Sequence, residues 1–187
     1  MQTMDQEVLQ HAAAWIGDGQ RPWLCTVVQA LGSSPRPVGS IVAVTEDGLQ
    51  IGSVSGGCVE EDLLESLRKG AYSGERPELI EYGISAEENE RLGLPCGGKV
   101  TLLLQRLEDT DMTWIEEVLT ALDQRCCIER DLNLTTGTTR LSNVEHFTGL
   151  AIDTQSLSQC FGPRMRMLLV GAGQLARNLA ELGLALD

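Results

Sequence analysis

Two cysteines, each beside a Gly-Gly pair, are the residues of this 187-residue chain best suited to chemistry. Cys58 follows Gly56-Gly57, and Cys96 precedes Gly97-Gly98. Glycine lets the backbone turn sharply and approach a ligand closely. At the first turn of a helix, the exposed amide groups and the helix dipole favour an anion such as a thiolate or a phosphate. For Cys58 alone, the competing interpretation is a strand-to-helix turn with a buried cysteine.

The loop at residues 32–39 carries side chains that suit an anion. It contains two prolines and two glycines within eight residues, which predicts a rigid, irregular loop. Ser33, Ser34 and Arg36 provide hydroxyl and guanidinium groups, which hold phosphate or carboxylate oxygens. The alternative is a solvent-exposed turn with an incidental arginine.

Hydrophobic periodicity predicts the elements that position these loops. Apolar residues recur at helical spacing in three segments, and short apolar or β-branched runs indicate five strands. Asp47-Gly48 is typical of a tight turn between two of those strands. The predicted helices lie at residues 5–17, 59–69 and 111–122, and the predicted strands lie at 22–31, 41–44, 49–54, 79–82 and 100–104.

This order of elements places the three loops near one another. In an antiparallel hairpin, the loop with Arg36 and the segment that ends at Cys58 lie at the same end. The Cys96 loop leads directly into a strand, and its Lys99 is available to lower a thiol pKa or to pair with an anion. Glu60 has two possible roles, because it could cap the following helix or orient a bound group. We expect the three loops to form one pocket.

The last part of the chain is expected to begin a further domain. We place a first domain at residues 1–145, a linker at 146–164 and a partial C-terminal domain at 165–187. The first domain would end in a hairpin of residues 127–134 and 138–144. Cys126 and Cys127 belong to this hairpin, and we assign them no chemistry.

Residues 165–176 have the pattern of a dinucleotide-binding unit. Residues 165–170 are an apolar run, as in a strand buried on both faces, and the turn with Gly171 and Gly173 and then a helix follow. Such a unit also needs a second strand and an acidic ribose ligand about 20 residues further on. The sequence contains neither, so we expect a truncated Rossmann-like unit that does not bind NAD(P) by itself.

Composition excludes several classes of protein. The formal net charge of −13 opposes binding to nucleic acid. No apolar run approaches the roughly 20 residues that span a bilayer, and the polar, acidic N-terminus is no signal peptide. We therefore expect a cytoplasmic protein whose six cysteines are thiols. With no CxxC motif and two histidines, a zinc site is not expected.

The motifs together resemble those of the xanthine dehydrogenase accessory proteins, the XdhC/CoxI family. Four features match in the family's order and cover nearly the whole chain. The SGGCxE and PCGG pair is specific, whereas the Rossmann fingerprint is not. The matching features are Gly32-Ser33-Ser34-Pro35-Arg36 with Gly39, Gly52-Ser53-Val54-Ser55-Gly56-Gly57-Cys58-Val59-Glu60, Leu94-Pro95-Cys96-Gly97-Gly98, and Val170-Gly171-Ala172-Gly173.

The resemblance implies a maturation factor rather than an enzyme. Such proteins bind the molybdenum cofactor, support its sulfuration by a cysteine desulfurase and deliver it to a molybdenum hydroxylase of the xanthine dehydrogenase type. Thiolates of Cys58 and Cys96 would suit the molybdenum–sulfur centre. The Arg36 loop and the backbone amides of residues 55–57 at the helix start would suit its phosphate. Whether the cofactor is the molybdopterin or a dinucleotide form stays open. The expected cofactor-binding residues are Ser33, Ser34, Arg36, Gly39, Ser55, Gly56, Gly57, Cys58, Glu60, Pro95, Cys96, Gly97, Gly98, Gly171 and Gly173.

The predicted fold is α/β, with a mixed-sheet N-terminal domain and the first strand and helix of a Rossmann-like domain. The truncated unit departs from the family's pattern and would leave apolar surface uncovered. We therefore expect a homo-oligomer, such as a dimer, or packing of residues 165–187 on the first domain. The alternative function is that of an NAD(P)-dependent oxidoreductase fragment that uses the turn at residues 171–176.

Overall fold

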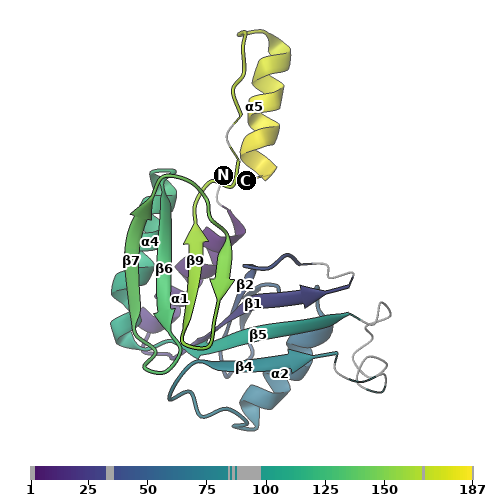
Figure 1. Ribbon diagram of the computed structural model, residues 1–187, viewed down its shortest axis with the longest axis vertical. Coiled ribbons are helices and arrows are strands. Elements are labelled where there is room, and N and C mark those ends of the chain that lie inside the picture. The colour runs from purple at the N-terminus through teal and green to yellow at the C-terminus, as the bar shows by residue number, and fades with distance from the viewer. Residues whose placement is uncertain are drawn as a thin grey trace.

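The computed structural model describes residues 3–32, 36–83, 85, 87, 98–165 and 167–186, with the backbone alone for Cys58 and residues 184–186. The chain begins with helix α1 (Met4–Gly17), whose first turn is capped because the Thr3 hydroxyl accepts a hydrogen bond from the Gln6 amide at 3.2 Å. Two antiparallel sheets and three further helices follow in the described part of the chain (Figure 1).

The first sheet has five strands in the order β3-β2-β1-β5-β4. We expected a mixed sheet, but every neighbouring pair of strands is antiparallel. β1 is at its centre and is buried along most of its length, which agrees with its apolar sequence. The strands are β1 (Trp23–Leu31), β2 (Ile41–Val44), β3 (Gln50–Gly52), β4 (Glu78–Tyr82) and β5 (Lys99–Arg106).

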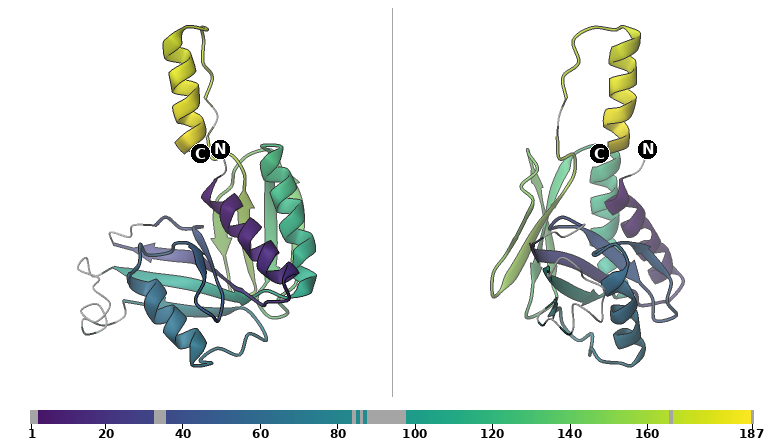
Figure 2. Two further views of the ribbon diagram at one scale, coloured as in Figure 1. Left: turned by 180° about the vertical axis from the view of Figure 1, so that it is seen from behind. Right: turned by 90° about the vertical axis from the view of Figure 1, so that its right-hand side faces the viewer.

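Helices cover both faces of this sheet because its strands alternate apolar side chains between two cores. Helix α2 (Cys58–Arg68) packs Val59, Leu63 and Leu67 against one face. Helix α1 packs against the other face with its own apolar stripe. The two views of Figure 2 show α1 and α2 in these positions. No helix in the described residues is long and apolar enough to cross a membrane.

A second sheet stands beside the first and shares a core with it. Its order is β7-β6-β9-β8, and all its pairs are antiparallel. Leu132 and Leu157 of this sheet pack against Val28 and Leu103 of the first. Its strands are β6 (Cys127–Asn133), β7 (Thr139–Val144), β8 (Leu150–Ile152) and β9 (Ser156–Phe161). The 3-10 turn η1 (Asp109–Asp111) and helix α4 (Met112–Asp123) precede them in the chain.

Two of these strands lie within residues 146–164, which we expected to form a linker. β8 has three residues, and β9 mixes serine and glutamine with apolar residues, so neither carries a strong strand pattern. Pairing with β6 buries β9 all the same, and Leu157 and Phe161 are core residues. The hairpin of β6 and β7 is confirmed, whereas the division of the chain into domains stays a prediction.

The C-terminal segment differs from the expected strand and helix. Helix α5 (Gln174–Leu186) is present, but Met165 and residues 167–170 are not in a strand. Four of these five side chains are exposed, at 84% for Met165 and 93% for Val170, and Leu169 is half-buried, so the run is not buried on both faces. The physical reason is that a β-strand forms only by pairing, and no strand of the described residues pairs with this run. The segment extends away from the two sheets (Figures 1 and 2).

Gly52 at the end of β3 is expected to tolerate no side chain. Its φ of +88° disfavours any other residue, and an added Cβ would lie 2.5 Å from the Ile41 carbonyl oxygen and 2.6 Å from Val8 Cγ2. Gly52→Ala should lower the free energy of unfolding by about 2–4 kcal/mol, measured by urea denaturation. Gly17→Ala is the matched control, because nothing lies within 4 Å of its added Cβ and its φ is not positive. Equal stability of the two variants would contradict this account.

Candidate functional site

The three loops singled out in the sequence leave the first sheet at the same end. Because the strands are antiparallel, β1, β3 and β4 end where β2 and β5 begin. The strand ends from which these loops leave therefore lie along a single edge of the sheet, at the right of Figure 1. Two of them touch, since a Cβ added to Gly32 would lie 3.3 Å from the Gly98 Cα, and Leu31 pairs with Lys99.

Several of the expected site residues lie outside the described residues. Arg36, Gly39 and Gly98 are described, as is the segment that leads into α2, where Cys58 is the first helical residue. The residues outside the description are Ser33, Ser34, Pro95, Cys96 and Gly97, together with the side chain of Cys58.

Glu60 organises the loop that precedes α2. Its Oε1 accepts hydrogen bonds from the Ser53 hydroxyl at 2.7 Å, the Val54 amide at 2.9 Å and the Ser55 amide at 3.0 Å. Its Oε2 accepts from the Ser55 hydroxyl and, at 3.1 Å, from the Gly57 amide. The side chain thus reaches back over the helix start, as in a capping box. Of the two roles expected for Glu60, the structure shows the cap.

This carboxylate is ionised and buried, with the residue only 2% exposed. Burial alone would raise its pKa, but hydrogen bonds from the hydroxyls of Ser55 and Ser53 and the amides of Ser55 and Val54 outweigh burial. The pKa falls from 4.5 to about 2. Such a difference corresponds to about 3 kcal/mol of folding free energy. The ionised Glu60 is therefore part of what holds this loop in place.

The amides that we expected to bind phosphate are engaged within the loop. Those of Ser55 and Gly57 donate to Glu60, and that of Gly56 donates to the Ser53 hydroxyl at 2.9 Å. The Ser55 hydroxyl also accepts from the Val59 amide at 2.9 Å. In this conformation the three expected amides have no hydrogen left for a ligand. A bound anion would be held by other groups at this end of the sheet.

The loop with Arg36 is fixed at its base by backbone hydrogen bonds. Gly39, at a φ of +92°, donates to the Val27 carbonyl at 2.8 Å, and Val27 donates to the Ser40 carbonyl at 2.9 Å. Gln159 from the second sheet donates to the Gly39 carbonyl at 3.1 Å. Arg36 is half-buried. The loop thus leaves β1 at Gly32, next to Gly98, and returns to β1 at Gly39, opposite Val27.

Two charged or nucleophilic groups near this end have structural partners. Lys99, which we considered for anion binding, forms an ion pair with Glu81 on the neighbouring strand at 2.9 Å. Cys25 in β1 is fully buried, and burial, together with the charge of Glu60, raises the pKa of its thiol. Cys25 is therefore an unreactive core residue. The described residues contain no group of three or more histidine, cysteine or acidic side chains that could hold a metal ion.

The remaining expected residues, Gly171 and Gly173, do not join this site. They lie in the segment that leads to α5 and extends away from the two sheets (Figure 1). Gly171 has a φ of +117°, and no atom lies within 4 Å of a Cβ added to either glycine. The structure brings together the ends of the three loops and leaves the glycine turn apart.

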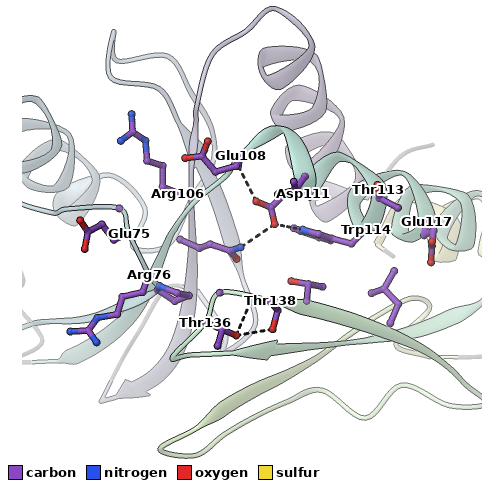
Figure 3. Close-up of a pocket in the computed structure, with 17 residues that line it drawn as sticks. Glu75, Arg76, Arg106, Glu108, Asp111, Thr113, Trp114, Glu117, Thr136 and Thr138 are labelled. Carbon is purple, nitrogen blue, oxygen red and sulfur yellow. Dashed lines mark hydrogen bonds between the residues drawn. The ribbon is translucent and has the colours of Figure 1, made fainter.

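A cavity that the sequence did not indicate lies between the two sheets (Figure 3). Its volume is about 480 Å³, and it opens between the loop at residues 74–77, the start of α4 and the β6–β7 turn. The Asp111 carboxylate accepts hydrogen bonds from Trp114 Nε1 at 2.7 Å, from Gln105 Nε2 at 3.3 Å and from the Glu108 amide at 2.9 Å. The lining comes from three separate stretches of the chain, within residues 74–77, 105–117 and 136–141, so no local spacing reveals the cavity.

The chemistry of this cavity does not suit an anionic ligand. Four carboxylates line it against two guanidinium groups. Behind it, the buried Arg130 donates to Gln105 and lies 4.0 Å from the centre of the Trp114 ring. Burial lowers the pKa of Arg130 to about 10, against the opposing effect of Asp111. We regard this cluster as a polar core between the sheets. The charged lining residues are Glu75, Arg76, Arg106, Glu108, Asp111 and Glu117.

The fold is that of an α/β protein with two antiparallel sheets. We call the edge of the first sheet where β1, β3 and β4 end and β2 and β5 begin the three-loop edge. The sequence model of the XdhC and CoxI family matches residues 15–83 of this chain. The resemblance seen in the motifs is thereby confirmed. The matched range contains the Arg36 loop and the whole Glu60 network.

Similar proteins extend the match beyond this range. The molybdenum cofactor insertion chaperone PaoD of Escherichia coli (strain K12) is 35% identical over 122 residues, which are 63% of this chain and 36% of that protein. A probable xanthine dehydrogenase subunit of Bacillus subtilis (strain 168) is 25% identical over 200 residues, which are 90% of this chain and 58% of that protein.

A solved structure has the same fold. The crystal structure of a xanthine dehydrogenase from Bacillus halodurans matches 87% of this chain with a TM-score of 0.60 and 24% sequence identity. The match covers 45% of that chain. In all three comparisons, therefore, the present chain spans less than two thirds of the protein that it matches.

Replacement of Glu60 by glutamine should destabilise the fold in a pH-dependent manner. The pKa of Glu60 is lowered on folding, so its contribution is fully present above pH 4.5 and is lost as the pH falls toward 2. Glu60→Gln should cost about 3 kcal/mol at pH 7, and the difference from the unmodified protein should shrink between pH 4.5 and 2.

Urea denaturation across this pH range measures both effects. Glu61→Gln is the control, because Glu61 is the next residue of α2 and is exposed. A pH-independent difference for Glu60→Gln would show that the ionised carboxylate is not what holds the loop.

Proposed function

We propose that this chain is an accessory factor that binds the molybdenum cofactor at the three-loop edge of the first sheet. The observation that carries the proposal is the convergence of the Arg36 loop, the start of α2 at Cys58 and the turn before β5 at Gly98. Two of these three loops lie in the range that matches the XdhC and CoxI family. The similarity to a protein named a molybdenum cofactor insertion chaperone supports the same role.

In this proposal, different residues bind the phosphate and the metal–sulfur centre of the cofactor. The guanidinium of Arg36 and the hydroxyls of Ser33 and Ser34 bind its phosphate. Thiolates from Cys58 and Cys96 approach its metal–sulfur centre, which prefers soft ligands. The amides before α2 serve Glu60, so in this proposal they shape the loop and do not contact the phosphate.

The electrostatics of α2 add a condition to this proposal. Glu60 already occupies the positive end of the helix, so the helix dipole alone gives little support to a thiolate at Cys58. A bound metal centre deprotonates a coordinating thiol directly. The thiolate of Cys58 is therefore expected with the cofactor bound rather than before it.

The wider role in this proposal is maturation of a partner enzyme. The chain supports sulfuration of the cofactor by a cysteine desulfurase and delivers the product to a molybdenum hydroxylase of the xanthine dehydrogenase type, in the cytoplasm and without an enzymatic activity of its own. The molybdopterin and dinucleotide forms both carry phosphate, and the Arg36 loop accepts either. An NAD(P)-dependent oxidoreductase fragment has less support, because residues 167–170 pair with no strand among the described residues.

Cofactor binding tests the role of the two cysteines. Anaerobic titration with cofactor released from a molybdenum hydroxylase should give at least about tenfold weaker binding for Cys58→Ser and for Cys96→Ser, which is about 1.4 kcal/mol. Cys126→Ser is the control, because Cys126 is an exposed thiol next to the second sheet. Unchanged affinity, with unchanged activation of the partner enzyme, in both variants would overturn the proposed site.

Self-association is the second testable part of the proposal. The segment from Met165 to α5 exposes large apolar side chains, with Leu168 at 88% and Leu175 at 73%. A second copy would cover this surface. Sedimentation velocity should show a concentration-dependent oligomer that is lost when residues 165–187 are removed. A monomer at every concentration would contradict this expectation.

A further inference from the structure

Two buried polar side chains of the second sheet reach across to the first. Arg130 on β6 and Gln159 on β9 are direct cross-strand neighbours. Both are nearly inaccessible, at 1% and 2% exposure. Arg130 donates to Gln105 on β5, toward the cavity between the sheets. Gln159 donates to the Gly39 carbonyl, at the base of the Arg36 loop. The two neighbours therefore contact different parts of the first sheet.

The contact of Gln159 falls at an irregular point of the first sheet. Gly39 also donates to Val27, and the register of β1 against β5 shifts between Val27 and Gln29. Gly39 has a positive φ, which is not a strand conformation, and hydrogen bonds with Val27 hold the turn at this point. The Nε2–O distance of 3.1 Å makes Gln159 a third anchor, in addition to the two backbone bonds between Val27 and residues 39–40.

A glutamine is a poor choice at this position if packing alone is considered. Its Oε1 is buried and has no hydrogen-bond partner among the described residues. Burying an unpaired carbonyl oxygen costs free energy that a hydrocarbon side chain of similar volume would not cost. Exchanging the two amide atoms would place two oxygens against each other, so the Gly39 contact requires the donor that the structure shows. The favourable interaction of the Gln159 amide is therefore its hydrogen bond to the Gly39 carbonyl.

We propose that Gln159 is a positioning residue that couples the second sheet to the Arg36 loop and sets the orientation in which that loop meets the cofactor. This inference rests on the function proposed for the three-loop edge. It gives the second sheet a part in binding, although no residue of that sheet belongs to the three loops. The coupling passes through one hydrogen bond, from Gln159 to the carbonyl of Gly39.

The test compares Gln159→Met with Arg130→Met, which removes the neighbouring contact between the sheets. The first readout needs no ligand: amide hydrogen exchange at Gly39, followed by NMR. Gln159→Met should speed exchange of the Gly39 amide at least about tenfold, whereas Arg130→Met should leave it within about twofold of the unmodified protein. Thermal unfolding should show the opposite pattern, with the larger loss of stability in Arg130→Met.

The second readout is affinity for cofactor released from a molybdenum hydroxylase. Gln159→Met should bind it at least about threefold more weakly, and Arg130→Met with unchanged affinity. If either variant fails to fold, Gln159→Asn replaces the first, since it keeps the amide but is one methylene too short to reach Gly39, and Arg130→Lys replaces the second.

Each outcome decides one part of the inference. Unchanged exchange at Gly39 in Gln159→Met would show that Gln159 does not position the loop. Faster exchange with unchanged affinity would show that the position of the loop does not matter for binding. If the unmodified protein does not bind the cofactor, the proposed function fails and the link to binding fails with it, while the exchange measurement still decides whether Gln159 holds the loop.

Discussion

A buried carboxylate at the start of α2 determines the shape of the candidate site. Glu60 is almost completely buried, so its charge is balanced by hydrogen-bond donors from the chain itself. The stretch before the helix supplies two serine hydroxyls and three amides for this purpose. Gly56 and Gly57, both at positive φ, let the backbone turn so that these donors point inward. The SGGCxE pattern is thus explained largely by one interaction.

The antiparallel order of the first sheet places the loop held by Glu60 at the same edge as the ends of the other two loops of the candidate site. Strands that alternate in direction bring the ends of β1, β3 and β4 and the starts of β2 and β5 to one edge, although they are far apart in sequence. With the Glu60 loop held rigidly, Cys58 starts α2 at a fixed place on that edge. The Arg36 loop is anchored separately, through Val27 and Gln159. The base of the Arg36 loop and the start of α2 are thus held by separate sets of hydrogen bonds.

Most of the first sheet and its helices could be predicted because each carries a strong local pattern. Helix α1, strands β1 and β2, and helix α4 lie within a few residues of their expected bounds. β8 and β9 were missed because they are short or polar, and only their pairing with β6 makes them strands. The strand predicted at residues 165–170 is not found at Met165 or residues 167–170, because no strand of the described residues pairs with this apolar run. The contact between Gln159 and Gly39 joins residues 120 positions apart, which local spacing cannot reveal.

The internal use of the loop amides changes where an anion would be recognised. A glycine turn before a helix is ordinarily an anion site because its amides are unpaired. Here an internal carboxylate already takes that position, so a phosphate would meet negative charge at the start of α2. In the proposed function, recognition of a phosphate therefore depends on side chains, above all on the guanidinium of Arg36. A side chain binds selectively only if its loop is held in place. The second sheet supplies such support through Gln159, and this accounts for a buried amide in a position where packing alone would favour a hydrocarbon.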